Sequence, residues 1–372
     1  MRVSVNIARI LVGCLFIFSG LVKAIDPLGL AYKMQEFFEV WADAGIMKGM
    51  MMWLHEHAVL FSVTMITLEV ILGVSLLLGT FKKLTAWLLL LLMLLFTFLT
   101  SYVLFSGKIR ACGCFGDCIP LTPIQTFTKD IILLLLVILI LFGQKHINLL
   151  LSKLVSYLIL GVCLIATLFL QWYVLKHLPI KDCLPYKVGN DILKLREMPA
   201  DAVQDKFDYS FIYEKDGVKK EFRSSNLPDS SWKYVDRKQI LIEKGKNNVP
   251  LINDFSFTTE SGNDTTVAIL SQPGEYYLLF IKTMEDNHWA DDDKLINTAR
   301  SSNIPLYVIT AQPQKVKEHF AKLDLHGIMP MIFTCDVTAI KTAARANPTL
   351  FKMKGSVVQQ KLSWADFDKV FK

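Results

Sequence analysis

Five apolar stretches, each long enough to cross a membrane, fill most of the first 175 residues of this 372-residue chain. A bilayer core about 30 Å thick needs about 20 apolar residues in a helix. The chain after residue 176 is polar and reads as water-soluble. The sequence therefore predicts an α-helical membrane bundle followed by a soluble part, with spans at 3–22, 58–78, 84–104, 124–142 and 149–175. We expect the first span to be retained rather than cleaved as a signal peptide, because Arg9 interrupts it and no Ala-x-Ala site precedes Asp26.

The charge of the chain argues against nucleic-acid binding. The formal net charge is +6, and charged residues make up 20% of the sequence, below the roughly 25% of typical soluble proteins. The basic residues are scattered or flank apolar stretches, whereas a nucleic-acid binder gathers them on one face. We expect membrane lipid as a partner and no nucleic acid.

Five spans place the two chain ends on opposite sides of the membrane. The Lys82-Lys83 pair in a very short turn favours a cytoplasmic N-terminus. In the inner membrane of a bacterium, the 107–123 loop and everything after residue 176 would then be periplasmic. The first outer loop, 23–57, has apolar residues at helical spacing, at Met34, Phe37, Phe38 and Trp41. This pattern predicts a helix that lies on the membrane surface or packs over the mouth of the bundle.

Two charged residues interrupt the apolar spans. Glu69 lies halfway along the second span, where a carboxylate faces the bundle interior and has a buried partner or a function. Arg9 is the nearest partner by depth. Glu69 is either a proton relay or a polar contact for a quinone head group, or it forms a structural hydrogen bond with an arginine or a serine that holds two helices together. Cys14 and Cys163, in two other spans, are expected to be buried among apolar neighbours.

Three cysteines, Cys112, Cys114 and Cys118, fall within seven residues of one loop. Neighbouring thiols can form an easily reduced disulfide, and the adjacent basic residues favour the nucleophilic thiolate. The alternatives are a fixed structural disulfide with one thiol left over, or a metal site, although the loop offers zinc three cysteines and no histidine. Cys183, just after the fifth span, emerges on the same face. As a fourth thiol it allows either a two-pair relay or two disulfides, and a free thiol is the alternative.

The first 145 residues resemble the DoxX/MauE superfamily of membrane bundles, through Arg9 to Gly13, Phe16 to Gly20, Glu69, Gly73 and Gly79. Its most specific part is Cys-Gly-Cys-Phe-Gly at 112–116, which resembles the signature of the MauE branch. The resemblance implies a four-helix core and a link to disulfide formation in periplasmic proteins. It matches Cys112 and Cys114 to the signature and assigns no role to Cys118.

The soluble half divides at about residue 260. The region 179–260 is predicted to be a strand-rich connection with a turn at Asp216-Gly217, and strands alternating with helices then predict an α/β sheet. Its ending resembles a thioredoxin fold, which implies a terminal helix at 363–371 and a cis-proline at Pro348. The stretch 283–291, where that fold carries Cys-x-x-Cys, contains no cysteine. We therefore expect a binding module, with Pro348, His288 and Trp289 as candidate partner contacts. A trans proline and a plain helix start are the alternatives.

These observations predict four segments: a DoxX/MauE-like bundle (1–145), a fifth membrane helix and linker (146–178), the strand-rich connection (179–260) and a thioredoxin-like domain (261–372). The leading hypothesis is thiol–disulfide exchange by Cys112 and Cys114 on a periplasmic client protein. Cys118 and Cys183 would be relay thiols, and a membrane quinone near Glu69 and Arg9 the electron acceptor. No other cofactor or metal is expected. The alternative is a membrane-anchored scaffold with one fixed disulfide; a transporter has less support because no internal repeat is evident.

Overall fold

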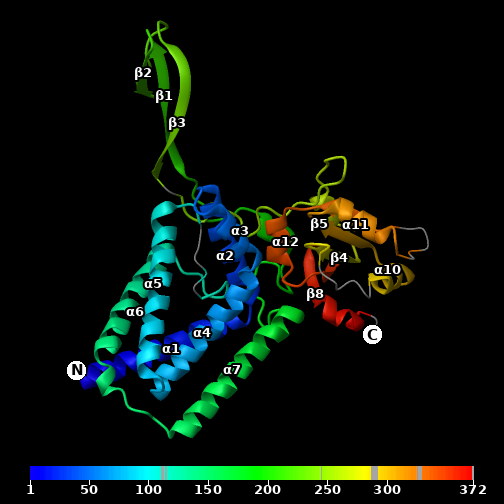
Figure 1. Ribbon diagram of the computed structural model, residues 1–372. Helices are drawn as coiled ribbons and strands as arrows, with labels where there is room; N and C mark the ends of the chain where they lie inside the picture. The colour runs from blue at the N-terminus through cyan, green and yellow to red at the C-terminus, as the bar shows by residue number, and fades with distance from the viewer. Residues whose placement is uncertain are drawn as a thin grey trace.

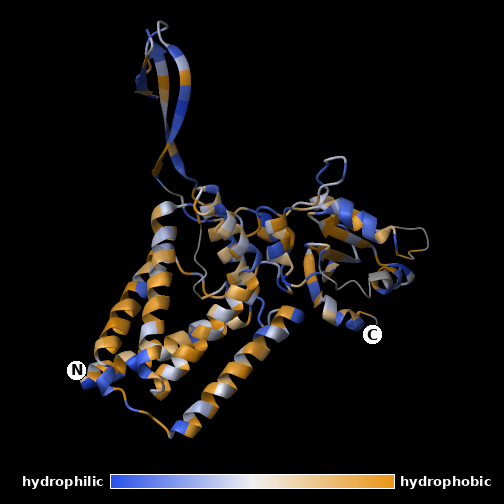
Figure 2. Ribbon diagram, viewed as in Figure 1, coloured by the Kyte–Doolittle hydropathy of each residue, from blue (hydrophilic) through white to orange (hydrophobic). Residues whose placement is uncertain are grey.

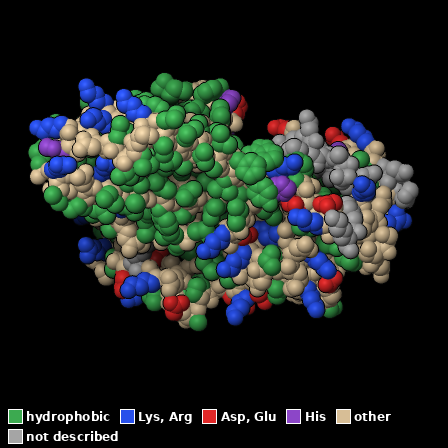
Figure 3. All heavy atoms as spheres, turned by 90° about the horizontal axis from the view of Figure 1, so that it is seen from below, with side chains coloured by type: hydrophobic (Ala, Val, Ile, Leu, Met, Phe, Trp, Pro, Cys, Tyr) green, Lys and Arg blue, Asp and Glu red, His purple; other side chains and the backbone are tan. Residues whose placement is uncertain are grey.

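The computed structural model describes residues 1–370 apart from 110–112, 114, 244, 286–291, 324 and 326–328. Within these residues, five helices are long and apolar enough to cross a membrane: α1 (Arg2–Ala24), α4 (Ala58–Leu78), α5 (Lys82–Ser106), α6 (Pro123–Phe142) and α7 (Lys153–Lys176). Figure 2 shows that these helices are predominantly hydrophobic, and hydrophobic side chains cover a broad area of the molecule in Figure 3. The predicted helical bundle is therefore confirmed.

Small residues set the packing of α1 against α4. A Cβ at Gly73 would lie 2.8 Å from the carbonyl oxygen of Gly13, so both glycines are needed for the backbones to approach this closely. Gly20 similarly faces Val70. The two helices are antiparallel, and these contacts fix their register. The core between α1, α4, α5 and α6 is apolar.

The loop between α1 and α4 folds into two helices, α2 (Pro27–Asp43) and α3 (Lys48–Glu56). The Asp26 side chain begins α2 by accepting a hydrogen bond from the Gly29 amide at 3.3 Å. Phe37 and Trp41 pack against Tyr102 of α5, with ring centroids 6.2 and 5.7 Å apart. Of the two predictions for this loop, packing over the mouth of the bundle is the one the structure shows.

The connection after α7 carries the short helix α8 (Ile192–Arg196) and then a three-stranded antiparallel sheet in the order β2-β1-β3. Its strands are β1 (Lys206–Lys215), β2 (Val218–Arg223) and β3 (Lys233–Glu243), and the sheet projects away from the rest of the molecule (Figure 1). Asp216 and Gly217 form the β1–β2 turn with φ of 51° and 77°, as the sequence predicted. The strand-rich prediction is confirmed.

The C-terminal domain is a five-stranded sheet in the order β6-β5-β4-β7-β8. Strands β4 (Glu275–Ile281), β5 (Leu306–Thr310) and β6 (Met331–Thr334) pair in parallel. Strand β7 (Thr349–Lys354) pairs antiparallel with β4 on one side and with β8 (Val357–Ser363) on the other. Strand β4 is buried from Tyr276 to Ile281 because both faces of the sheet are covered. The helices are α9 (Thr266–Leu270), α10 (Asp292–Ser301), α11 (Pro313–Phe320) and α12 (Val337–Ala343).

Two sequence predictions for this part of the chain need comment. The expected terminal helix at 363–371 is a short 3-10 helix, Trp364–Lys369, which starts where Ser363 caps the Ala365 amide at 3.1 Å. The Asn347–Pro348 peptide bond is cis, as the thioredoxin resemblance implied. The α/β prediction for this domain is confirmed.

Candidate redox site at the junction of membrane and soluble domains

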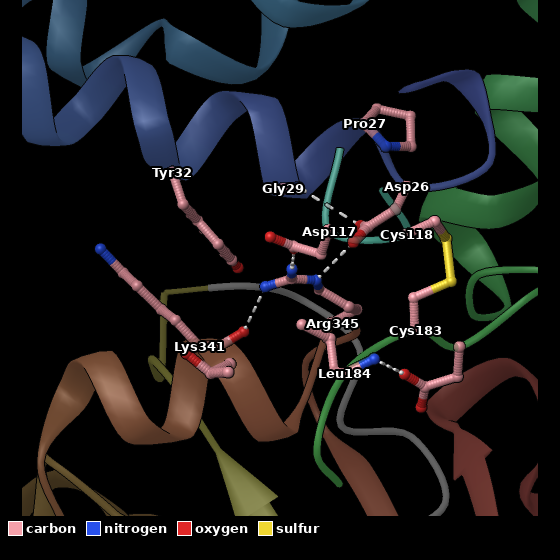
Figure 4. Close-up of polar contacts among 12 residues, drawn as sticks. Asp26, Pro27, Gly29, Tyr32, Asp117, Cys118, Cys183, Leu184, Lys341 and Arg345 are labelled. Carbon is pink, nitrogen blue, oxygen red and sulfur yellow. Dashed lines mark hydrogen bonds and ion pairs between the residues drawn. A yellow bond between two sulfur atoms is a disulfide. The ribbon is translucent and has the colours of Figure 1, made fainter. Parts of the chain in front are cut away.

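Cys118 and Cys183 form a disulfide that joins the cysteine loop to the segment after α7, with their Cα atoms 5.0 Å apart (Figure 4). The sequence allowed Cys118 to pair within its own loop, and that pairing is wrong because its partner is 65 residues away. Cys112 and Cys114 lie outside the described residues, so their redox role stays a prediction. The disulfide therefore leaves these two as the candidate exchanging pair.

Each cysteine of this disulfide follows an aspartate that pairs with a cation of the thioredoxin-like domain. Asp117 Oδ2 accepts a hydrogen bond from Arg345 Nη2 at 2.8 Å, and Asp182 Oδ2 accepts one from Lys361 Nζ at 2.6 Å. Both cationic side chains are only 6% exposed. Burial lowers the pKa of Lys361, although Asp182 opposes the shift. The soluble domain thus holds both chain segments that the disulfide joins.

Arg345 is the centre of this junction. Its Nε donates to Asp26 Oδ2 at 2.9 Å, and its Nη1 donates to the Lys341 carbonyl at 2.9 Å. Burial alone would lower the pKa of Arg345, but Asp26 and Asp117 hold it above its ordinary value. Burial also raises the pKa of Asp26, although Arg345 counteracts part of the shift. A Cβ at Gly29 would lie 3.1 to 3.5 Å from this group of charges, so glycine leaves room for it.

Tyr32 of α2 sits among three cations of the thioredoxin-like domain. Lys282, Lys341 and Arg345 lie 5.3 to 5.7 Å from its ring centroid, within the range of cation–π attraction. Lys282 Nζ also donates to the Tyr32 hydroxyl at 3.0 Å. A cationic face of the domain therefore docks on a face of the membrane bundle that is acidic and aromatic.

The loop that carries Pro348 belongs to this docked face. The Asn347 Oδ1 accepts a hydrogen bond from the Lys282 amide at 2.8 Å, and Lys282 Nζ donates to the Arg345 carbonyl at 2.7 Å. Pro348 itself is buried. His288 and Trp289, the other candidate partner contacts, lie outside the described residues.

Inside the membrane, Glu69 pairs with Lys23 rather than with Arg9. The two side chains are 1% and 4% exposed, and Ser19 Oγ donates to Glu69 Oε2 at 3.1 Å. Arg9 instead donates from its Nε to the Leu76 carbonyl at 2.7 Å, at the C-terminal end of α4. The predicted Arg9–Glu69 pair is wrong because the register of the antiparallel helices places Lys23, not Arg9, at the depth of Glu69.

The Lys23–Glu69 pair borders a cavity of about 220 Å³ near the end of the bundle that contacts the soluble domain. Aromatic and methionine side chains of α2 line part of it: Met34, Phe37, Phe38 and Trp41. Its wall also includes Phe115 of the cysteine loop, whose ring centroid is 4.8 Å from Lys129 Nζ. The next residue, Asp130, is fully buried, and its carboxylate forms an ion pair with Lys129 Nζ at 2.8 Å. The cavity is thus apolar with a few buried charged groups.

The remaining cysteines do not join the site. Cys14 is exposed and Cys163 is half-buried, so the prediction that membrane neighbours bury them is wrong. Both lie on outer faces of the bundle, where lipid replaces protein as the apolar neighbour. Cys335 is buried in the sheet core.

Burial raises the pKa of the Cys335 thiol to about 11. Since only the thiolate reacts, we expect N-ethylmaleimide at about pH 8 to leave Cys335 unmodified in the folded protein and to label it after denaturation. Peptide mapping by mass spectrometry measures this. Rapid labelling of Cys335 in the folded chain would contradict the buried environment.

The bundle, its cysteine loop and the sheet of the soluble half define a MauE/DoxX-like membrane protein with a C-terminal thioredoxin-like region. Residues 1–143 match the family described as methylamine utilisation protein MauE. Residues 207–244, the projecting three-stranded sheet, match a domain of unknown function, DUF8463. Protein TlpB of Flavobacterium psychrophilum is 31% identical over 196 residues, and the match covers 50% of each chain. No solved structure matches the chain.

Sequence reasoning missed the charged docking face. Arg345 is 319 residues from Asp26 and 228 from Asp117, and no sequence pattern connects positions so far apart. One feature of the sequence points to this docking face: an Asp-Cys dipeptide occurs both at 117–118 and at 182–183.

Proposed function

We propose that this protein catalyses thiol–disulfide exchange on the periplasmic side of a bacterial inner membrane and passes electrons to a membrane quinone. In the first step, a thiolate of the client attacks the disulfide of the loop, so the client gains a disulfide and two loop thiols form. In the second step, the loop thiols are reoxidised and the quinone takes up two electrons and two protons. Cys112 and Cys114 are the candidate exchanging pair, and Cys118 and Cys183 the second pair.

The observation that carries this proposal is the contact between the cysteine loop and the intramembrane cavity. Phe115 follows Cys114 directly and forms part of the cavity wall together with Lys23 and Glu69. A quinone head group is flat and apolar with two carbonyl oxygens. The aromatic lining fits its ring, and the cationic Lys23 and Lys129 are donors for its oxygens. The Asp130 carboxylate, paired with Lys129, is a buried acid–base group at the same cavity.

Cysteine replacement tests the exchange reaction. We expect Cys112→Ser and Cys114→Ser to abolish oxidation of a reduced client-like peptide by the full-length protein in quinone-containing nanodiscs. Rapid acid quenching and alkylation of the wild type should trap a mixed disulfide on one of the two. Cys163→Ser is the matched control, because that thiol is outside the site, and it should keep full activity. Unchanged activity in both loop variants, with no trapped mixed disulfide, would refute the proposal.

A second candidate function is a membrane-anchored scaffold with a fixed disulfide. The ion pairs that hold Asp117 and Asp182 favour it, since they fix the segments on either side of Cys118–Cys183. So does the absence of cysteine from 283–291. The reduction potential of the disulfide at Cys112 and Cys114 separates the two functions. A value below about −300 mV supports the scaffold, and a higher value supports exchange.

A further inference from the structure

The end of the bundle that carries the N-terminus has an unusual charge pattern. Three segments meet there, 1–4, 79–83 and 143–153, and they contain Arg2, Lys82, Lys83, Lys145 and Lys153 but no aspartate or glutamate. Positive charge that no acidic residue balances, at the level where helices leave the membrane, attracts anionic lipid head groups.

A cleft of about 630 Å³ opens at this end, between the α4–α5 turn and the start of α7. One wall is the turn from Gly79 to Leu84, and the other is formed by 147–149 with Lys153 and Tyr157. The rings of Phe81 and Tyr157 stack across it with centroids 5.3 Å apart. The cleft therefore has apolar walls as well as charged groups.

Three lysines line this cleft: Lys82, Lys83 and Lys153. Among the described residues, no carboxylate lies within 4.0 Å of any of them. Lys82 Nζ donates only a long hydrogen bond, 3.4 Å, to the Ile147 carbonyl. Helices α5 and α7 both begin here, and their N-terminal dipoles add positive potential. At α5 the preceding residue is Phe81, whose side chain caps no backbone amide.

We propose that this cleft binds the head group of an anionic phospholipid, with its phosphate between Lys82, Lys83 and Lys153. The acyl chains would run into the membrane beside Leu84 and Tyr157. A lipid fits better than a soluble phosphate because the lysines lie at the ends of membrane helices and the walls beside them are apolar. The bound lipid would fill the space between α7 and the other helices, and α7 connects the bundle to the soluble domain.

Lipid binding to the full-length protein in detergent, followed by native mass spectrometry, tests the site. The probes are phosphatidylglycerol, phosphatidylcholine and inorganic phosphate. We expect phosphatidylglycerol to bind far more tightly than either of the others. The K82A/K83A/K153A variant should bind it roughly a hundredfold more weakly, since each lysine near a head group contributes about 1 kcal/mol and 1.4 kcal/mol corresponds to a factor of ten.

Lys145→Ala is the matched control, because Lys145 lies at the same end of the bundle but does not line the cleft. It should keep wild-type affinity, and K82R/K83R/K153R should keep most of it. Equal binding by the triple alanine variant overturns the proposal. So does an equal loss in Lys145→Ala, which would indicate a diffuse surface charge. Inorganic phosphate that competes as tightly as the lipid also overturns it.

Discussion

Replacement of Arg345 by methionine is expected to loosen the thioredoxin-like domain from the membrane bundle. The variant keeps an unbranched, flexible apolar chain but leaves Asp26 and Asp117 without their buried cation. Removal of one partner from a buried, hydrogen-bonded charge group costs about 3–5 kcal/mol. Hydrogen exchange of the full-length protein in nanodiscs should show loss of protection in α2 and around residues 341–348, by about a hundredfold or more.

Two further variants show whether charge causes this loss. Addition of Asp26→Asn to Arg345→Met removes the stranded carboxylate and should restore part of the protection. Lys317→Met removes an exposed ion pair with Glu260, so it should change nothing measurable. The idea fails if Arg345→Met leaves exchange unchanged, or if Lys317→Met has the same effect.

The pH dependence of the Arg345→Met variant follows from the same buried acid. Burial raises the pKa of Asp26, so the docked state favours the protonated carboxyl. Without Arg345 this preference is stronger, and the docked state is penalised wherever Asp26 is ionised. Docking of the variant should therefore recover as the pH falls through the raised pKa and weaken again as it rises. Hydrogen exchange as a function of pH measures this, and a loss of docking at lower pH would contradict it.

The fold was predictable where local pattern decides it. Hydrophobic length located the five membrane helices, and alternation of strands and helices located the C-terminal sheet. Ends of elements were less predictable because capping fixes them. For example, α6 begins at Pro123 because Thr122 and Gln125 form a reciprocal cap.

The site was predictable only in its parts. Cys118 and Cys183 were identifiable as residues on one face of the membrane, but their pairing depends on how the loop and the end of α7 are held together. Glu69 was identifiable as a buried acid, but its partner depends on a helix register set by Gly13, Gly20 and Gly73. Such contacts arise from tertiary packing, which periodicity in one sequence does not encode.

Lys23→Met is expected to be among the most destabilising single changes in the membrane bundle. The substitution leaves the Glu69 carboxylate buried beside the cavity with Ser19 as its remaining hydrogen-bond donor among the described contacts. An uncompensated buried charge costs about 3–5 kcal/mol, part of which is relieved if Glu69 takes up a proton. We expect a clear fall in the midpoint of thermal unfolding of the full-length protein, and weaker binding of a quinone analogue in the cavity.

A double-mutant cycle separates this pair from its surroundings. Glu69→Gln combined with Lys23→Met replaces the ion pair by neutral groups of similar size, so the double variant should be more stable than Lys23→Met alone. Lys33→Met is the matched control, because Lys33 also lines the cavity but pairs with Glu36 at a half-exposed site. It should cost no more than about 1 kcal/mol. If the double variant were no more stable than Lys23→Met, burial of an unpaired carboxylate could not be the cause. An equal cost for Lys33→Met would show that cavity packing, rather than the buried pair, governs stability here.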